Sequence, residues 1–268
     1  MVSPANPPEP TTKRRGRVAR RTAIVAGSAL ALVVAAATPA LAAPPAKLPG
    51  NAEAVETKWQ PAYDYDTDGC YPTPAIGPTG TVNGGLNPTG SLSGDCHDTS
   101  DLDNTNGYSR YKCNNGWCAM AYALYFEKDQ ALANSSIGGH RHDWEHVVVW
   151  TQNDVAKYVS TSNHGDFTIY AASGVIWTGN HPKIVYHKDG VSTHCFRLAN
   201  SGDEPPENAY HTWQYPTLVG WNGFPSTSIR TTLSNYDFGS ANFGLKDANF
   251  VNLITEAMPA GISFNPAA

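Results

Sequence analysis

The stretch GGHRHDWEHVVVW, at Gly138–Trp150, contains three histidines, an arginine, an aspartate and a glutamate within seven residues, followed directly by an apolar run. Valine and the aromatic residues favour strands over helices, so we predict a buried strand that begins near His142. Successive side chains of a strand point to opposite faces. One face then carries the two carboxylates, Asp143 and Glu145. The opposite face carries His142, Trp144 and His146.

The same stretch supplies the side chains for a cation site. His140 follows Gly138 and Gly139, in a flexible turn from which its ring can bend toward the carboxylates of Asp143 and Glu145. Two carboxylates and one imidazole suit calcium, magnesium or manganese better than zinc, which prefers more histidine or cysteine. The alternative is a solvated or ion-paired polar cluster beside a strand.

Patterns for enzymatic chemistry are weak in this chain. HRHDWEH differs from the HExxH pattern of zinc proteases, so a zinc hydrolase is a minor alternative. The chain contains no GxSxG, GxGxxG or P-loop sequence, which leaves acyl transfer and nucleotide chemistry without support. His164, in SNHGDF, is expected at a turn, either as an exposed loop histidine or in contact with a ligand.

The rest of the chain predicts a mostly β domain with flanking helices. Short β-rich runs bounded by Gly, Pro and Asn are typical of a sandwich or barrel. The expected strands are His146–Thr151, Asp166–Ala172, Ile184–Tyr186 and Thr193–Leu198. Trp117–Asp129 fits the periodicity of a strand and of a helix. One helix is expected near the end, capped by Asp247 and stopped by Pro259. No linker or repeat interrupts residues 61–268, which predicts one domain there.

Residues 1–42 have the pattern of a secretory signal peptide. Residues 13–21 carry six basic side chains, an uncharged run covers Ala23–Ala37, and Ala40 and Ala42 fit a cleavage site. The alternative is a membrane anchor, but the apolar run is shorter than the roughly 20 residues of a membrane span. We therefore predict a secreted, extracellular product, with a Pro- and Ala-rich leader over residues 43–60. The basic residues do not decide between general secretion and twin-arginine export.

Removal of residues 1–42 changes the charge balance. The whole chain has 18 Lys+Arg and 23 Asp+Glu, and the mature chain keeps 12 basic and 22 acidic residues. A net charge of −10 argues against binding to nucleic acid or to anionic lipid through bulk charge, and favours cations or neutral polar ligands.

The five cysteines are consistent with an exported protein, in which they most often form disulfides. Cys70 and Cys96 bracket a Gly/Pro-rich stretch, and a bridge there would contribute about 3–4 kcal/mol in the loop-entropy model. Cys113 and Cys118 can form a second, local bridge; their spacing does not match the usual zinc CxxC pattern. Cys195 is left over, and we expect an inert buried thiol.

The heptapeptide GHRHDWE, at Gly139–Glu145, resembles the signature of the necrosis-inducing NPP1-like (Nep1-like) proteins. The resemblance extends over nearly all of residues 61–268. Its other parts are Asp68–Tyr71, Gly84–Leu86, Pro88–Gly90, Cys96, Ala119–Asp129 (AMAYALYFEKD), the HVVVW run, Tyr215–Trp221 (YPTLVGW), Asp237–Phe243 (DFGSANF) and the final helix.

The resemblance implies a central β-sandwich with flanking helices, similar to actinoporins and fungal lectins. It also implies a divalent cation, calcium or magnesium, at the membrane-facing end of the sandwich. The family's ligands correspond to Asp129, His140, Asp143 and Glu145, which adds Asp129 to the three residues above. Candidates for supporting these ligands or for contacting lipid are His142, Trp144, His164 and Trp177.

The family's function implies a cytolysin and not an enzyme. Such proteins bind the sugar head groups of glycosylated sphingolipids and damage plant plasma membranes, and plant immune receptors detect a peptide that corresponds to Ala119–Trp144. We therefore expect a secreted, monomeric, metal-dependent cytolysin. The alternatives are a non-toxic glycolipid- or sugar-binding member and a metal-dependent hydrolase of plant cell-wall material.

Overall fold

Two long paired strands form the centre of the structure. The computed structural model describes residues 43–268, so the predicted signal peptide lies outside the described residues. Strand β3 (Trp117–Asp129) pairs antiparallel with β4 (His140–Gln152) along almost its whole length, and both are buried on both faces. The ambiguous stretch Trp117–Asp129 is therefore a strand. Its apolar residues fit the period of a helix as well as that of a strand because apolar side chains occupy both of its covered faces.

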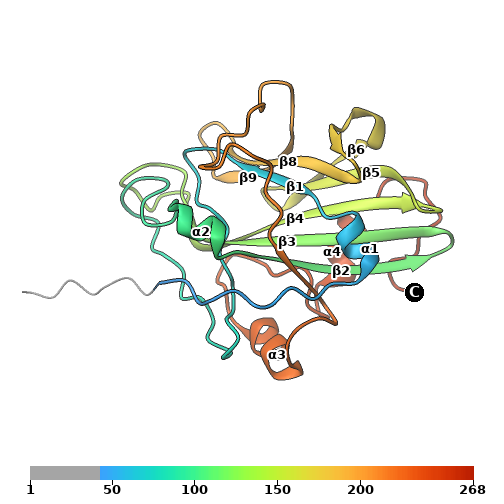
Figure 1. Cartoon of the computed structure of the whole chain (residues 1–268), viewed down its shortest axis with the longest axis horizontal. Helices are drawn as coiled ribbons and strands as arrows, with labels where there is room; N and C mark the ends of the chain where they lie inside the picture. Colours follow the sequence, from blue (N-terminus) through green and yellow to red (C-terminus); the bar gives the residue numbers. More distant parts are fainter. Residues whose placement is uncertain (1–42) are drawn as a thin grey trace, which may run out of the picture. The chain divides into compact units, whose positions relative to one another are not determined.

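The two strands belong to a six-stranded sheet with the order β10-β2-β3-β4-β5-β6 (Figure 1). The other members are β2 (Asn106–Asn114), β5 (Val155–Asn163), β6 (Asp166–Ala171) and β10 (Thr217–Gly220). Consecutive strands from β2 to β6 are antiparallel, whereas β10 runs parallel to β2.

A second sheet is built around β8 (His181–Lys188). Its other strands are β1 (Ala62–Tyr65), β7 (Trp177–Thr178) and β9 (His194–Leu198). β8 pairs parallel with β1 and antiparallel with β7 and β9.

The alternation of side chains along β3 explains how the layers are stacked. Ala119, Ala121 and Ala123 face a core shared with helices α3 (Thr227–Asn235) and α4 (Phe250–Glu256). Met120, Tyr122, Leu124 and Phe126 face a second core, which contains Tyr63, Ile184, Tyr186 and Phe196 of the small sheet. The described chain is thus a β-sandwich with helices on the outer face of its larger sheet, which confirms the predicted fold class.

Several sequence predictions differ in detail from the structure. The final helix begins at Phe250 with Asn249 at its N-cap, whereas the carboxylate of Asp247 lies 2.9 Å from the guanidinium of Arg110. The strand expected over Asp166–Ala172 ends at Ala171, where a 3-10 turn over Ala172–Gly174 begins. The strand expected from Thr193 begins at His194.

Residues 43–60, which the composition predicts to be a leader, lie against the sandwich. Leu48 is fully buried, and its backbone N–H donates to Asn106 Oδ1 at 2.7 Å. The short helix α1 (Ala54–Lys58) follows, and Tyr122 donates a hydrogen bond to the carbonyl of Glu56 at 2.7 Å. A second short helix, α2 (Thr99–Asp103), precedes β2.

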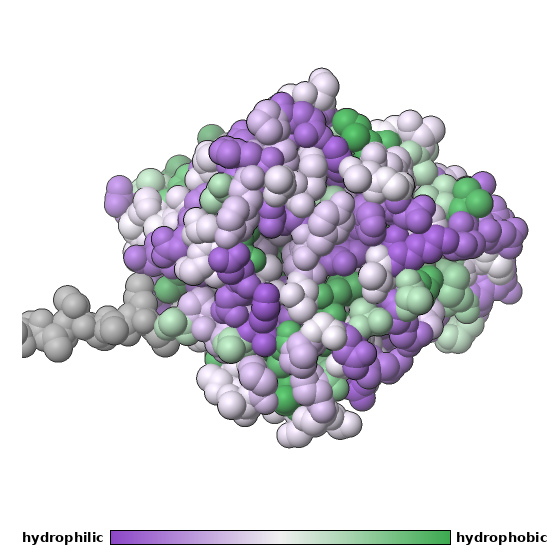
Figure 2. Space-filling model, in the orientation of Figure 1, coloured by the Kyte–Doolittle hydropathy of each residue, from purple (hydrophilic) through white to green (hydrophobic). Residues whose placement is uncertain are grey.

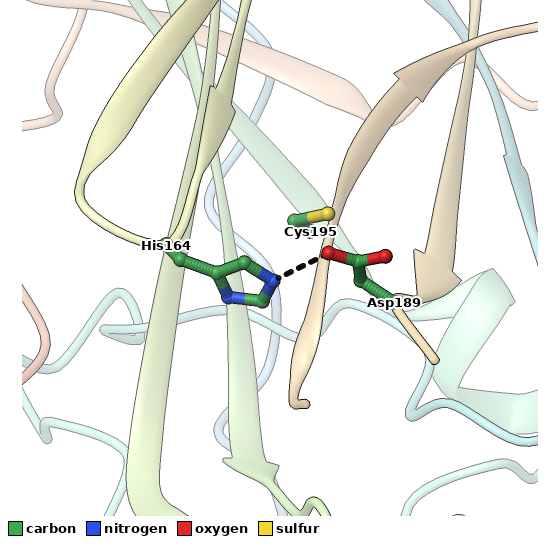
Figure 3. A group of neighbouring side chains, drawn as sticks. All are labelled: His164, Asp189 and Cys195. Atoms are coloured by element: carbon green, nitrogen blue, oxygen red, sulfur yellow. Dashed lines mark hydrogen bonds and ion pairs between the residues drawn. The ribbon is translucent and has the colours of Figure 1, made fainter. Parts of the chain in front are cut away.

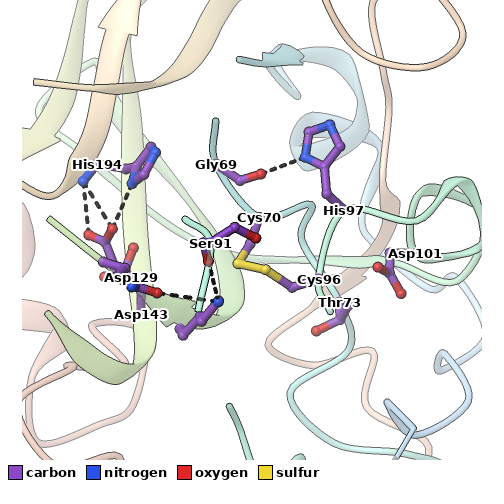
Figure 4. Close-up of a disulfide and its surroundings, with 12 residues drawn as sticks. Gly69, Cys70, Thr73, Ser91, Cys96, His97, Asp101, Asp129, Asp143 and His194 are labelled. Carbon is purple, nitrogen blue, oxygen red and sulfur yellow. Dashed lines mark hydrogen bonds and ion pairs between the residues drawn. A yellow bond between two sulfur atoms is a disulfide. The ribbon is translucent and has the colours of Figure 1, made fainter. Parts of the chain in front are cut away.

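Both expected disulfides are present, and Cys195 is a buried free cysteine. Cys113 and Cys118 are directly opposite each other in the β2–β3 hairpin. Cys70–Cys96 joins two irregular segments that come before α2, near the end of the sheet where β3 stops and β4 starts (Figures 1 and 4).

The surface is mostly polar on the face drawn in Figure 2, where hydrophobic residues form small separate groups. Within residues 43–268, no helix is both long enough and apolar enough to cross a membrane.

Candidate metal centre

Three of the four predicted cation ligands converge where β3 ends and β4 begins. Asp129, His140 and Asp143 each place one ligand atom within 4.8 Å of the others. Asp129 and His140 are paired directly across the β3–β4 ladder, which brings together two residues eleven positions apart. They line a pocket of about 460 Å³.

His140 belongs to β4, which corrects the expectation that it precedes the strand in a turn. It still reaches the carboxylates because His142 has a φ of 62° and interrupts the alternation of the strand. His140 therefore lies with Asp143 instead of with His142. A left-handed backbone is uncommon for a residue other than glycine, and histidine is among the residues that adopt it more often than most.

The carbonyl of His142 also orients the ring of His140. His140 Nδ1 lies 2.7 Å from this oxygen, and a carbonyl can only accept, so Nδ1 is the protonated nitrogen. In a neutral ring the Nε2 lone pair is then free for a cation, an arrangement common to metal-binding histidines.

Gly139 allows the two strands to approach closely at this point. A Cβ atom at this position would lie 2.8 Å from the carbonyl oxygen of Asp129 and 3.1 Å from Gln130 Cα. Both atoms belong to the backbone and cannot move aside easily. The first residue of GHRHDWE is thus glycine because a side chain would push Asp129 away from His140.

His194, on β9, is the residue that the sequence analysis missed. Its backbone N–H donates to both carboxylate oxygens of Asp129, at 2.9 and 3.1 Å, and its Nδ1 lies 2.7 Å from Oδ1 (Figure 4). Its Nε2 lies 3.5 Å from the carboxylate of Asp68. Burial by itself lowers the pKa of His194, but the hydrogen bonds to Asp129 and Asp68 outweigh it and raise the pKa to about 9.

Lys128 secures the neighbouring loop from the same end of β3. Its buried ammonium donates to the carbonyl of Ser91 at 2.9 Å and to that of Thr89 at 3.3 Å. The Lys-Asp pair at the end of AMAYALYFEKD therefore has two structural roles. Lys128 holds the Pro88–Ser91 region, and Asp129 faces the pocket.

Glu145 lines the same pocket but lies outside the group formed by the other three ligands. Its carboxylate accepts a hydrogen bond from the hydroxyl of Ser162 on β5, and that hydroxyl oxygen accepts from the backbone N–H of His146 at 2.7 Å. Asp143 and Glu145 are both on the inner face of β4, as the alternation predicted, and Tyr186 donates to Asp143 Oδ2 at 3.1 Å.

Burial of several carboxylates together makes their ionisation costly. Burial, followed by the neighbouring charge of Asp129, raises the pKa of Asp143 to about 7. Burial also raises the pKa of Glu145 well above its ordinary value, and the charge of Asp143 adds to the effect. A bound dication would reverse this balance, since it offsets the mutual repulsion and the lost hydration of the carboxylates.

The remaining candidates have different positions. His142 and Trp144 face the helix layer, where His142 Nδ1 lies 2.6 Å from the Tyr125 hydroxyl. Burial, with help from Arg141, lowers the pKa of His142 to about 4, so the ring is neutral. Trp144 and His164 both line the pocket. Trp177 does not: it packs on Trp59, with ring centroids 6.4 Å apart.

The fold and the pocket define a class: a two-sheet β domain with a buried, acidic, histidine-containing site at one end. The chain belongs to the family of necrosis-inducing proteins, because the family model "Necrosis inducing protein (NPP1)" matches residues 53–257. Among its relatives, NLP effector protein 10 of Phytophthora capsici is 34% identical over 197 residues, which are 71% of this chain and 77% of the relative.

Solved structures share the fold. Necrosis and Ethylene inducing Protein 2, from the agent of witches' broom disease of cocoa, is 30% identical with a TM-score of 0.69, and the match covers 80% of this chain and 95% of that one. NLPPya in complex with mannosamine is 29% identical with a TM-score of 0.66, covering 82% and 96% of the two chains. HaNLP3, described as non-toxic, is 26% identical with a TM-score of 0.68, covering 81% and 99%.

Proposed function

We propose that this protein is a secreted, divalent-cation-dependent cytolysin that binds the sugar head groups of glycosylated sphingolipids in plant plasma membranes and damages the membrane. The observation that carries the proposal is the convergence of Asp129, His140 and Asp143 in one pocket of about 460 Å³. Membership in a family of necrosis-inducing proteins supports the toxic outcome.

The donor set suits calcium or magnesium. Asp129 and Asp143 supply carboxylate oxygens, His140 supplies one nitrogen, and Glu145 lies in the same pocket. Hard dications prefer such oxygen-rich sets and often keep some water or ligand oxygens in their coordination shell. Sugar hydroxyls or a phosphate oxygen can take those positions when the ion is bound.

A cation is also needed for reasons of charge. The mature chain carries 12 basic and 22 acidic residues, so its overall field repels the phosphate of an inositol-phosphate head group. A dication in the pocket offsets the charges of the Asp129 and Asp143 carboxylates and presents a positive centre to the head group. The complex of a structural neighbour with mannosamine supports a sugar ligand for this fold, and we extend that ligand class to this chain.

The loops around the pocket carry exposed apolar side chains that can contact the bilayer. Ile137, in the loop from β3 to β4, is 76% exposed, and Val191, in the turn from β8 to β9, is 87% exposed. Asp129 and His140, which flank the first loop, and Ser192, which follows Val191, all line the pocket. We propose that these two side chains enter the lipid interface after the head group is bound. Trp177, on the two-residue edge strand β7, is half-buried against Trp59 and is less suited to contact with the bilayer.

Export is part of the proposal. The signal peptide proposed for residues 1–42 rests on its sequence pattern. The two disulfides support it, because disulfides persist in oxidising compartments outside the cytosol. We further propose that the released protein is a monomer.

Recognition by plant immune receptors, proposed for Ala119–Trp144, would require release of that peptide. Ala119–Phe126 is buried within β3 between the two cores of the sandwich. A receptor that reads these side chains must therefore bind unfolded or proteolysed protein.

The test is dye release from vesicles made of dicot plasma-membrane lipids, with residues 43–268 and with or without a chelator. Release that stops with chelator and returns with calcium or magnesium is the expected result. Asp143→Asn should abolish release while the far-UV circular dichroism spectrum stays unchanged. Asp154→Asn makes the same chemical change at an exposed residue in the β4–β5 turn, at the opposite end of β4, and should release dye like wild type.

Chelator-insensitive release would contradict the role of the cation. Vesicle binding without release would favour the non-toxic sugar-binding alternative; a neighbour with this fold, HaNLP3, is described as non-toxic. Release of soluble sugar from cell-wall material, without vesicle leakage, would favour the hydrolase.

A further inference from the structure

A second group of metal-ligating side chains lies beside the pocket. His164 is in the turn between β5 and β6, Asp189 is in the turn between β8 and β9, and Cys195 is on β9 (Figure 3). One ligand atom of each lies within 4.8 Å of the others. The group therefore connects the larger sheet, through His164, with the smaller sheet, through Asp189 and Cys195.

His187, on β8, lies outside this group of three but contacts its thiol. His187 is directly opposite Cys195 in the β8–β9 ladder, and its Nε2 lies 3.5 Å from Cys195 Sγ. When zinc binds a sulfur at about 2.3 Å and a nitrogen at about 2.0 Å in tetrahedral geometry, these two atoms lie about 3.5 Å apart. The pair is thus already at the spacing that a zinc ion requires.

The side chains are arranged so that an ion can enter from solvent. The His164 and Asp189 side chains are 30% and 53% exposed, whereas Cys195 is 1% exposed. His164 Nε2 lies 3.2 Å from Asp189 Oδ2, and its Nδ1 lies 3.3 Å from the hydroxyl of Thr193, which orients the ring. An ion held first by the exposed pair can then reach the thiol behind it.

The chemistry of this set differs from that of the Asp129 cluster. One thiol, two imidazoles and one carboxylate are ligands for zinc and similar borderline metals, and they do not suit calcium or magnesium. Burial raises the pKa of the Cys195 thiol to about 12, so the free group keeps its proton. Metal binding converts it to a thiolate, and the proton passes to water.

We propose that His164, Asp189 and Cys195, joined by the neighbouring His187 as fourth ligand, form a zinc-class site that clamps the β5–β6 turn to the β8–β9 hairpin. His164 and Thr193 also line the pocket that contains Asp129 and Asp143. An ion in the second site therefore fixes the position of residues in one wall of this pocket. The two sites take different ions, and metal binding at the second, a structural clamp, is measured separately from the lipid-binding function proposed above.

The test is a titration of metal-free residues 43–268 with Co²⁺, the spectroscopic substitute for zinc. Cys195 is the free cysteine of a chain whose other four cysteines form disulfides, so a thiolate-to-cobalt charge-transfer band reports on it alone. We expect such a band to saturate at one equivalent, to disappear when Zn²⁺ is added, and to be absent in Cys195→Ser. Asp189→Asn, a change of an exposed side chain that does not disturb the core, should weaken zinc binding about tenfold or more.

Asp143→Asn is the matched control, because it alters the other cluster and should keep the band. If wild type shows no charge-transfer band with excess Co²⁺, the proposal is wrong. It is equally overturned if Asp189→Asn and His187→Ala bind zinc as tightly as wild type. Neither result affects calcium- or magnesium-dependent dye release, so the two proposals fail separately.

Discussion

His194 holds the carboxylate of Asp129 through two nitrogens: its Nδ1 lies 2.7 Å from Oδ1, and its backbone N–H lies 2.9 Å from Oδ2. The two residues are on β9 and β3, in different sheets. A contact between the sheets therefore orients a proposed cation ligand, and the position of Asp129 depends on how the small sheet packs.

Replacing His194 by alanine is expected to weaken calcium or magnesium binding by about 10- to 100-fold. The reason is that Asp129 loses the imidazole bond that helps to orient it and keeps only the two bonds from the backbone N–H, and a less firmly oriented ligand binds its metal less well. Isothermal titration calorimetry on the folded variant measures the change. His181→Ala is the matched control, since the Nδ1 of His181 likewise lies within hydrogen-bond distance of an oxygen, the carbonyl of Gln60 at 2.6 Å, but His181 lies outside the pocket. Equal affinities of wild type and His194→Ala would show that Asp129 does not need this support.

Replacing Ile137 or Val191 by serine is expected to weaken binding to plant-lipid vesicles by roughly tenfold each. Burying an aliphatic side chain of this size contributes about 1.5–3 kcal/mol, and about 1.4 kcal/mol corresponds to a tenfold change in affinity. Co-sedimentation with vesicles measures binding, and calorimetry checks that cation affinity is unchanged. Val155→Ser is the control, because Val155 is 55% exposed in the strand that follows the β4–β5 turn, at the other end of the sheet. Equal losses in all three variants would argue against membrane contact at the pocket end.

Replacing Asp66 by asparagine is expected to raise the melting temperature more at pH 8 than at pH 5. Burial, opposed by Arg197 and assisted by nearby carboxylates, raises the pKa of Asp66 from 3.8 to about 7. Between these values the folded protein binds more protons than the unfolded chain, so the contribution of Asp66 to stability is lost as the pH rises through 7. Asparagine cannot ionise and avoids this loss.

Thermal unfolding followed by circular dichroism at both pH values measures the difference between variant and wild type. Asp154→Asn, in an exposed turn, is the control and should shift the melting temperature little at either pH. If Asp66→Asn raised the melting temperature more at pH 5 than at pH 8, the result would contradict the buried-carboxyl explanation.

The two disulfides are expected to contribute unequally to the free energy of unfolding. Cys70–Cys96 spans 26 residues and Cys113–Cys118 spans 5, which correspond to about 3–4 and about 2 kcal/mol in the loop-entropy model. The shorter bridge also duplicates a hairpin that β2 and β3 already form. Denaturant unfolding of the two double-serine variants measures both contributions. Because Asp68 and Gly69 pack against His194 and directly precede Cys70, only loss of the longer bridge should also weaken cation binding.

The local sequence was sufficient to predict a mostly β domain, the strand after His142 and the separation of carboxylates from aromatic residues in GHRHDWE, whereas the choice of a sandwich over a barrel came from the family resemblance. These features follow from the two-residue period of a strand and from residue preference, and both act between near neighbours in the chain. The family resemblance supplied Asp129, which periodicity could not have identified because eleven positions separate it from His140.

The tertiary structure alone decided which side chains meet. His194 contacts Asp129 across 65 residues, and Cys195 meets His164 because the β5–β6 turn and β9 lie side by side. The left-handed backbone of His142, which moves His140 to the carboxylate side, is not fixed by residue preference, because histidine is enriched in that region but does not usually adopt it. Sequence patterns record the period of an element and the conformations its residues favour. Contacts between sheets depend on packing, twist and loop closure, which no local pattern contains.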